Sequence, residues 1–370
     1  MSADPGRSEI DGRVLAWMRE PEWNYDEARF EQLALELFAF QFEHCEVFRR
    51  FCEGRGQTPS TIEGWRRIPA VPAGAFKEVE LRSFPSEATT HRFRTSGTST
   101  SVRGTLHLDT LELYEASLLP TFRRFVFPEM TTPLDRAAIR VLAPPPDQEP
   151  DSSLSHMFGV ALAELGAAGS SFDVDDGVLQ VDLLLTSLVE SAASESPVAL
   201  CGTAFAFVHL IDHLVRRGVL VGLPPASRVM ETGGFKGRSR EMPPAALYAE
   251  LKRVLGIPAE RIVNQYGMTE LGSQFYDSVL RAPSEPRRKL GPPWARVVII
   301  DPDTGHEAAT GHVGTIVVID LANTGSVLAL QTGDLGRAVL DGFEVVGRGP
   351  GAEERGCSIA ADELLGHESP

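Results

Sequence analysis

Lysine is scarce in this chain of 370 residues, since only four of its 35 basic residues are lysines. An excess of positive charge is also lacking: the net charge is −16, which argues against a nucleic-acid partner. No apolar run is long enough to span a membrane. The first residues lack the basic and then apolar order of a signal peptide. We therefore expect a cytoplasmic protein without a membrane span.

Cysteine is rare as well, and its spacing is uninformative for metal binding. Cys45, Cys52, Cys201 and Cys357 form no CxxC pair, which argues against a zinc site or a disulfide framework. Four scattered thiols fit a reducing compartment. Where arginine predominates so strongly, a retained lysine suggests a need for a compact charge on a flexible arm.

What the chain does contain is an alternation of short apolar runs with amphipathic segments. Apolar residues at helical spacing predict helices within residues 10–54. Strand-like runs are Gly104–Leu108, Ala138–Leu142, Val178–Leu185, Val198–Cys201, Ser227–Glu231 and Arg261–Gln265, and helical ones are 111–127, 156–168, Ala204–Arg217 and Ala245–Leu255. This order predicts an α/β fold with parallel sheets flanked by helices.

The pattern changes near residue 290. Short strands separated by Gly, Asp and Asn turns are predicted at Ala295–Asp301, Gly314–Asp320, Ser326–Gln331 and Phe343–Val346. They indicate a small, mainly antiparallel β subdomain. We divide the chain into a helical N-terminal segment (1–90), an α/β core (91–288), this β subdomain (289–347) and a C-terminal tail (348–370).

The segment Phe93–Ser101, Phe-Arg-Thr-Ser-Gly-Thr-Ser-Thr-Ser, is rich in hydroxyls and glycine. Backbone N–H groups and hydroxyls of such a loop can surround the oxygens of a phosphate group. A solvated turn has the same composition, so the segment gains meaning only from the motifs that follow it.

Three further motifs follow predicted strands. In Asn264–Glu270, Asn-Gln-Tyr-Gly-Met-Thr-Glu, the Thr269 hydroxyl and the Glu270 carboxylate suit a phosphate with Mg²⁺. In Gln331–Asp334, Gln-Thr-Gly-Asp, the carboxylate can accept both hydrogens of a ribose diol. Gly347-Arg348 comes shortly afterwards.

The four motifs in this order resemble the adenylate-forming superfamily of acyl- and aryl-CoA ligases, luciferases and adenylation domains, over roughly residues 68 to 358. Within it the chain is most similar to acyl-protein synthetases of the LuxE type. Further motifs behind that similarity are Ile68-Pro69, Phe76-Lys77, Ser152–His156 (SSLSH), Glu231–Gly237 (ETGGFKG) and Arg355–Ser358 (RGCS). The resemblance implies the fold of the superfamily's N-terminal domain. The usual C-terminal domain is expected to be absent, because only 22 residues follow Arg348.

The resemblance also implies an activity. Such enzymes use ATP to activate a carboxylic acid as acyl-AMP and pass the acyl group to a cysteine near their C-terminus; the resemblance implies a fatty acid as the substrate. Cys357 matches that cysteine, and an acyl reductase or carrier protein is the implied partner. Two alternatives stay open: a ligase that delivers acyl-AMP directly to coenzyme A or an amine, and a non-catalytic scaffold that binds nucleotide or acyl ligands.

The roles that the resemblance implies fall on matching positions. The resemblance implies that the β- and γ-phosphates of ATP are surrounded by Thr95, Ser96, Gly97 and Thr98, and that the adenine and the acyl carboxylate are framed by Gly233, Gly234, Asn264, Gln265, Tyr266 and Gly267. It also implies that Thr269 contacts the α-phosphate, that Glu270 holds Mg²⁺, and that Asp334 binds the ribose with Arg348 nearby. The acyl pocket would be lined by His156, Phe205 and Phe207. For the last three, core packing or helix capping is the alternative, and Cys357 has the alternative of a small apolar residue.

The phosphate loop departs from the superfamily pattern. It normally ends in Pro-Lys-Gly, whereas here Arg103 precedes Gly104 and is expected to supply the charge. The superfamily's catalytic lysine belongs to the C-terminal domain, so another cation must assist adenylation. Lys77 and Lys236 are the two candidates, and we favour Lys77.

Overall fold

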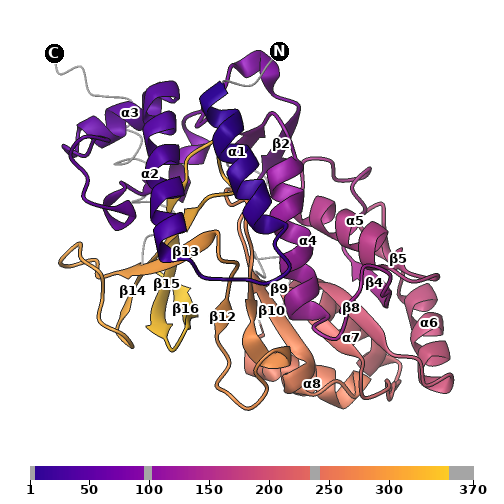
Figure 1. Cartoon of the computed structure of the whole chain (residues 1–370). Coiled ribbons are helices and arrows are strands. Elements are labelled where there is room, and N and C mark those ends of the chain that lie inside the picture. Colours follow the sequence, from indigo (N-terminus) through magenta and orange to yellow (C-terminus); the bar gives the residue numbers. More distant parts are fainter. Residues whose placement is uncertain (1–4, 96–101, 234–241, 350–370) are drawn as a thin grey trace. The chain divides into compact units, whose positions relative to one another are not determined.

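The computed structural model describes residues 5–95, 102–233 and 242–349 (Figure 1). The chain divides into two compact units that are each built from several segments. Unit 1 comprises Met1–Leu118, Met268–Gln274 and Lys289–Pro370, and unit 2 comprises Leu119–Gly267 and Phe275–Arg288. The short segment Met268–Gln274 thus belongs to unit 1, although the chain on both sides of it belongs to unit 2.

Unit 2 contains a mostly parallel sheet in the order β11-β10-β9-β8-β4-β5. Its strands are β4 (Ala138–Leu142), β5 (Ser171–Phe172), β8 (Val198–Thr203), β9 (Arg228–Thr232), β10 (Ile262–Tyr266) and β11 (Phe275–Asp277). Only the pair β10/β11 is antiparallel among these neighbours. The near-continuous apolar runs of β8 and β9 are buried along their length, as expected for parallel strands covered on both faces.

Helices supply the cover for this sheet. The helices of unit 2 are the second half of α4 (Glu112–Val126), α5 (Ser153–Leu165), α6 (Val181–Ala193), α7 (Ala204–Arg216) and α8 (Pro244–Leu255). One apolar core joins Leu200 and Val229 of the sheet to α6, α7 and α8. On β11, the Tyr276 ring stacks on Phe125 of α4, with ring centroids 5.8 Å apart. The central strands are therefore shielded from water, which strengthens polar interactions at their ends.

Unit 1 contains antiparallel strands in the order β13-β14-β15-β16-β12, and β1 pairs in parallel with β15. Their bounds are β1 (Val71–Pro72), β12 (Lys289–Leu290), β13 (Ala295–Ile300), β14 (Val313–Asp320), β15 (Ala329–Val339) and β16 (Gly342–Arg348). A separate hairpin joins β2 (His91–Arg94) to β3 (Thr105–Leu108). The 3₁₀ turn η2 (Ala73–Lys77) follows β1 directly.

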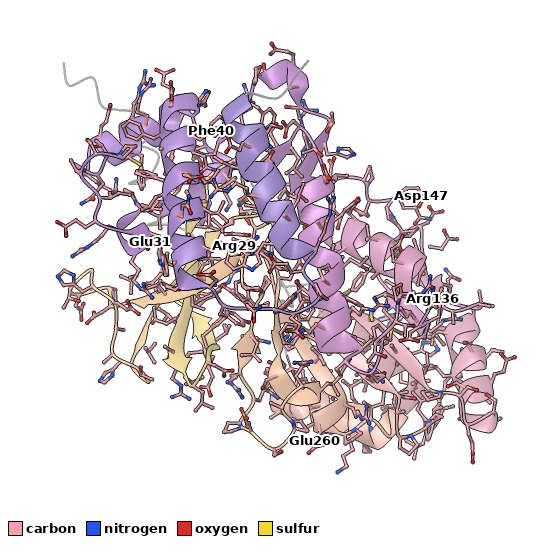
Figure 2. All side chains as sticks on the ribbon, in the orientation of Figure 1. Arg29, Glu31, Phe40, Arg136, Asp147 and Glu260 are labelled. Atoms are coloured by element: carbon pink, nitrogen blue, oxygen red, sulfur yellow. The ribbon has the colours of Figure 1, made fainter. Side chains whose placement is uncertain are left out.

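Helices α1 (Pro5–Met18), α2 (Glu27–His44) and α3 (Glu46–Glu53) also belong to unit 1. Helix α2 begins where Asp26 accepts a hydrogen bond from the Arg29 N–H, at 3.0 Å. Its buried residues Phe30, Leu33, Ala34, Leu37 and Phe38 follow helical spacing and form one apolar face. Arg29, labelled in Figure 2, lies 4.6 Å from the ring centroid of Trp17 in α1. Packing of α1 against α2 thus rests on apolar and cation–π contacts.

The predicted fold class, α/β with parallel strands and a small antiparallel part, is confirmed. Three local predictions were wrong. Val178–Leu185 is not one strand, because β7 (Val178–Leu179) ends there and α6 begins at Val181, burying Val181, Leu184 and Leu188 at helical spacing. The predicted strand Ser326–Gln331 begins later, at Ala329, and continues to Val339, so Thr332–Asp334 lies inside β15. Strand β2, which precedes the predicted phosphate-binding loop, was missed.

A stability prediction follows from the close approach of β4 and β8. A Cβ atom at Gly202 would lie 2.8 Å from the Leu142 Cβ and 2.9 Å from its carbonyl oxygen. We expect Gly202→Ala to lower the free energy of unfolding by about 1–3 kcal/mol through overpacking. Gly12→Ala is the matched control, because a Cβ there meets nothing within 4 Å. Urea midpoints that are equal for the two variants would contradict the prediction.

Candidate active site

The predicted phosphate-binding loop lies in sequence between the two strands of the β2–β3 hairpin. Thr95 follows β2 directly and makes two hydrogen bonds with Gly104: the Thr95 N–H donates to the Gly104 carbonyl, and the Gly104 N–H donates to the Thr95 hydroxyl oxygen, both at 2.9 Å. The Arg103 Nε donates to the Thr95 carbonyl at 2.6 Å. Arg103 therefore links the two ends of the loop. Ser96, Gly97 and Thr98 lie outside the described residues.

Lys77 lies beside the end of the loop at Gly104. A Cβ atom at Gly104 would lie 3.4 Å from the Phe76 Cβ and 3.5 Å from the Phe76 carbonyl carbon, so the end of η2 packs against the loop. The Lys77 side chain is half-buried. Within the described residues it makes no hydrogen bond or ion pair. Its ammonium group is thus available to a ligand; the other candidate, Lys236, lies outside the described residues.

Glu270 and Thr269 lie in a turn that unit 1 holds in place. Glu270 is 6% exposed, and its carbonyl oxygen accepts a hydrogen bond from the Asn323 Nδ2 at 2.7 Å. Further along the same turn, the Ser273 hydroxyl and N–H donate to the two carboxylate oxygens of Asp320, at 2.7 and 2.8 Å. Both anchors belong to the end of β14 and the loop behind it.

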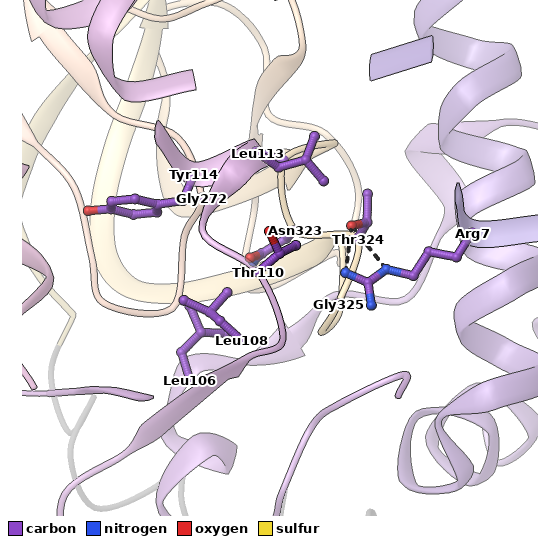
Figure 3. Close-up of a pocket in the computed structure, with 11 residues that line it drawn as sticks. Arg7, Leu106, Leu108, Thr110, Leu113, Tyr114, Gly272, Asn323, Thr324 and Gly325 are labelled. Carbon is purple, nitrogen blue, oxygen red and sulfur yellow. Dashed lines mark hydrogen bonds between the residues drawn. The ribbon is translucent and has the colours of Figure 1, made fainter. Parts of the chain in front are cut away.

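That loop, residues 321–328 between β14 and β15, is itself buried. Asn323 is 3% exposed and Thr324 fully buried. Figure 3 shows Arg7 extending from α1 to Thr324, whose hydroxyl accepts from the guanidinium at 3.3 and 3.4 Å. Gln41 of α2 donates to the Asn323 carbonyl at 2.8 Å and accepts from the Leu328 N–H at 2.9 Å. A buried loop needs such internal partners, because water cannot satisfy its backbone.

In unit 2 the ends of β9 and β10 lie side by side, with Thr232 opposite Gln265. The Thr232 hydroxyl donates to the Gln265 Oε1 at 2.5 Å. A Cβ at Gly267 would lie 2.4 Å from the Gln265 Nε2, so a larger residue there would require the Gln265 amide to move. Tyr266 is half-buried and Gly233 is exposed just beyond β9. Gly234 lies outside the described residues.

The Asn264 side chain is oriented by a buried carboxylate. Its Nδ2 donates to the Glu231 Oε1 at 2.7 Å, and the same oxygen accepts from the Tyr248 hydroxyl at 2.9 Å. The Asn264 N–H donates to the Asp277 carboxylate at 2.9 Å, and Arg287 donates to that carboxylate at 2.5 Å. Burial, together with the charge of Glu231, raises the pKa of Tyr248, which keeps its hydroxyl protonated as a donor.

Asp334 and Arg348 are direct partners on neighbouring strands β15 and β16. The Arg348 Nε lies 3.6 Å from the Asp334 Oδ1. The carboxylate is mostly buried, with 18% of the side chain exposed, whereas 65% of the Arg348 side chain is exposed. The Asp334 N–H donates to the Thr332 hydroxyl at 3.1 Å, which fixes the backbone of the motif. The structure thus brings these two predicted residues together.

The predicted acyl-pocket residues lie in unit 2. His156 and Phe205 are half-buried, on α5 and α7. Phe207 is fully buried within the apolar core of unit 2. Burial therefore favours core packing for Phe207, and the pocket role stays a prediction for His156 and Phe205.

Sequence reasoning missed the polar residues that support the predicted site. In unit 1 these are Gln41, Asp320 and Asn323. Their signal in the sequence is weak: each is a single polar residue beside apolar ones that the structure buries. Burial raises the pKa of Asp320, and four hydrogen-bond donors from Ser273, Ala322 and Gly272 oppose that shift.

Metal ligation by the protein alone is not evident. Across residues 5–95, 102–233 and 242–349 there is no group of three or more His, Cys, Asp or Glu side chains placed to hold an ion. A single carboxylate such as Glu270 still fits Mg²⁺, because this ion keeps several waters and binds substrate phosphates. In the described part of the chain, no helix is both long and apolar enough to span a membrane.

The fold has clear structural relatives. It matches crystal structures of 2-hydroxyisobutyryl-CoA ligase, one in an open conformation with 2-HIB-AMP and CoA and one in the postadenylation state with 2-HIB-AMP. The TM-scores are 0.59 and 0.61 at 15% identity, covering 87% and 89% of this chain and 75% and 69% of the relatives. The fold is therefore that of the adenylate-forming ligases.

Comparison of the sequence identifies the family within the adenylate-forming ligases to which the chain belongs. The family model "Acyl-protein synthetase, LuxE" matches residues 5–365, and the chain belongs to this family of ligases. A curated relative, the long-chain-fatty-acid–luciferin-component ligase of Aliivibrio fischeri, is 22% identical over 335 residues. That match covers 89% of this chain and 84% of the relative. The family assignment made from the sequence motifs is confirmed.

The described thiols give a prediction on reactivity. Cys45, Cys52 and Cys201 are buried, and burial raises the pKa of all three, to about 12 for Cys52 and Cys201. Because the thiolate is the reactive form, we expect iodoacetamide at about pH 8 to spare them in the native protein. Peptide mass spectrometry should find them alkylated only after unfolding in guanidinium. Alkylation at equal rates in both states would contradict this.

Proposed function

We propose that this chain uses ATP and Mg²⁺ to activate a fatty acid, and then transfers the acyl group to Cys357. In the first step a carboxylate oxygen bonds to the α-phosphorus and pyrophosphate leaves. In the second step the cysteine thiolate bonds to the acyl carbon and AMP leaves. A reductase or carrier protein, or a small thiol, then accepts the acyl group. The named activity of the A. fischeri relative supports a long-chain acid as the substrate.

The observation that carries the proposal is the position of η2. This turn contacts both β3, which follows the predicted phosphate-binding loop, and β15, which contains Asp334. We therefore propose that Lys77, the last residue of η2, lies between the predicted phosphate contact and the predicted ribose contact. An ammonium group there would stabilise the charge that develops on the α-phosphate during attack. All these residues belong to unit 1.

The remaining contacts to ATP, Mg²⁺ and the acid are proposed for the residues of the sequence motifs. Thr95 and the loop behind it would bind the β- and γ-phosphates, and Thr269 the α-phosphate. Glu270 would hold Mg²⁺, which neutralises phosphate charge when it is bound. Asp334 would accept the ribose hydroxyls, with Arg348 beside it, and the residues Gly233, Gly234, Asn264, Gln265, Tyr266 and Gly267 would frame the adenine and the acyl carboxylate. Lys236 remains the second candidate for the catalytic cation.

Cys357 is the proposed nucleophile, although it lies outside the described residues. The state of the other three thiols supports it, because their raised pKa values disfavour the thiolate that attacks acyl-AMP. Arg355, two residues before Cys357, would favour its thiolate by charge.

The test separates the two steps. The protein is incubated with ATP, Mg²⁺ and a panel of carboxylic acids, and pyrophosphate exchange and intact protein mass are measured. We expect exchange with long-chain acids and an acyl adduct on the protein. Cys357→Ala should keep the exchange and lose the adduct, whereas Cys52→Ala, which removes a buried thiol, should keep both.

Three outcomes would contradict parts of this proposal. Absence of exchange with every acid would remove the adenylation step and favour a binding scaffold. An adduct that persists in Cys357→Ala would remove the proposed nucleophile. Exchange without any adduct, together with acyl-CoA or amide formation, would favour direct transfer from acyl-AMP.

The role of Lys77 gives a separate prediction. Lys77→Met should lower kcat for exchange by about 100-fold, because one fixed donor to the transition state is lost. Its melting temperature should stay near that of the wild type, since Lys77 has no partner among the described residues. Lys252→Met, at an exposed position on α8, is the matched control and should retain activity. Full activity of Lys77→Met would leave the role to Lys236.

A further inference from the structure

We propose that Asn323 is a positioning residue, which sets the Mg²⁺-binding geometry by fixing the backbone of Glu270. This inference rests on the proposed function, because it deepens the role given there to Glu270. Asn323 touches neither nucleotide nor metal in this proposal. It acts through the turn Thr269–Ser273, and its effect should therefore appear in the binding of Mg·ATP rather than in that of the acid.

The contact is direct and buried. The Asn323 Nδ2 donates to the Glu270 carbonyl at 2.7 Å and to the Val327 carbonyl at 3.3 Å, so both hydrogens of the amide have acceptors. Asn323 is 3% exposed and Glu270 6%. Because water is excluded, the Glu270 carbonyl has no solvent substitute for this donor. The bond therefore fixes the backbone from which the Glu270 carboxylate extends.

A second anchor keeps the turn from pivoting about that bond. Asp320 accepts both hydrogen bonds from Ser273, three residues after Glu270. Between the two anchors, a Cβ at Gly272 would lie 2.8 Å from the Ala322 Cβ, so the two backbones are in close contact. The turn is thus held at two points and pressed against the loop between them.

The loop that carries Asn323 is fixed in turn by the N-terminal helices. Gln41 is fully buried, and its Nε2 donates to the carbonyls of Asn323 and Thr324 at 2.8 and 3.2 Å. Arg7, also bonded to Thr324, pairs with both carboxylate oxygens of Asp109 at 2.6 and 2.9 Å. A series of buried polar contacts therefore runs from α1 and α2 through Asn323 to Glu270, all within unit 1.

The size of the effect follows from the chemistry of the ion. Mg²⁺ requires near-ideal octahedral geometry, so a small displacement of its carboxylate weakens binding. Losing one buried hydrogen bond costs about 1 kcal/mol, which corresponds to about a fivefold change in affinity. We expect Asn323→Ala to raise by about fivefold both the Mg²⁺ concentration for half-maximal pyrophosphate exchange and the Kd of Mg·ATP. The KM of the acid should stay unchanged.

Ser326→Ala is the matched control. Ser326 is on the same loop, is 1% exposed, and donates to the Leu81 carbonyl at 2.7 Å rather than to the turn that contains Glu270. Ser326→Ala therefore removes one buried hydrogen bond from this loop, against two in Asn323→Ala, and it should keep the wild-type Mg²⁺ dependence. Calorimetry gives the Kd of Mg·ATP without acid, and thermal melting shows the stability loss of each variant.

The outcomes are distinct. Equal Mg²⁺ dependence in Asn323→Ala and Ser326→Ala, or an equal rise in the KM of the acid, would overturn the inference. Where Asn323→Ala does not fold, Ser273→Ala replaces it: this variant keeps the N–H bond to Asp320 and should show the same shift, and a wild-type Kd for Mg·ATP would overturn the inference. A wild-type protein that binds Mg·ATP without exchange removes only the proposed function; one that does not bind it removes both.

Discussion

The constraint on which unit 1 depends is the burial of the loop between β14 and β15. A loop without solvent must find partners for its polar backbone inside the protein. Here Gln41 and Ser83 supply them from two different parts of the chain, Ser83 donating to the carbonyls of Thr324 and Gly325, while Arg7 donates to the Thr324 hydroxyl. Asn323 of this loop and Asp320 at the end of β14 bond to the turn that contains Glu270. Folding of the N-terminal helices and placement of the predicted metal ligand are therefore linked.

The sequence predicted the fold class because parallel strands covered on both faces leave continuous apolar runs, as in Val198–Cys201 and Ser227–Glu231. It failed where such a run is short, as at Val181–Leu185, since a buried helix and a strand then look alike. Motifs at strand ends singled out Thr95, Tyr266 and Glu270 as candidates, and their roles stay predictions. The resemblance also placed Arg348 near Asp334, whereas the register that makes them direct partners on β15 and β16 is not encoded in local sequence.

The residues that support the site were beyond sequence reasoning for a physical reason. Asn323 and Gln41 are 282 residues apart in the chain, and their contact exists only because α2 packs over the loop. A lone glutamine within an apolar helix face is neither a motif nor a charge pattern. Its meaning comes from the three backbone groups that it satisfies, and two of them, the carbonyls of Asn323 and Thr324, belong to a connection that sequence alone would place on the surface.

The contacts of the arginines and of Lys77 suggest a reason for the scarcity of lysine. Arginine serves fixed geometry in this fold: Arg7 pairs with both oxygens of Asp109, Arg287 joins Asp277 to the Ala259 and Ile262 carbonyls, and Arg103 braces its own loop. A planar guanidinium suits such permanent multiple bonds. A cation that must follow charge as it moves from carboxylate to phosphate is better supplied by a compact ammonium on a flexible chain. Lys77, half-buried and without a partner among the described residues, is the candidate that we propose for this role, whereas Arg103 already bonds to the Thr95 carbonyl.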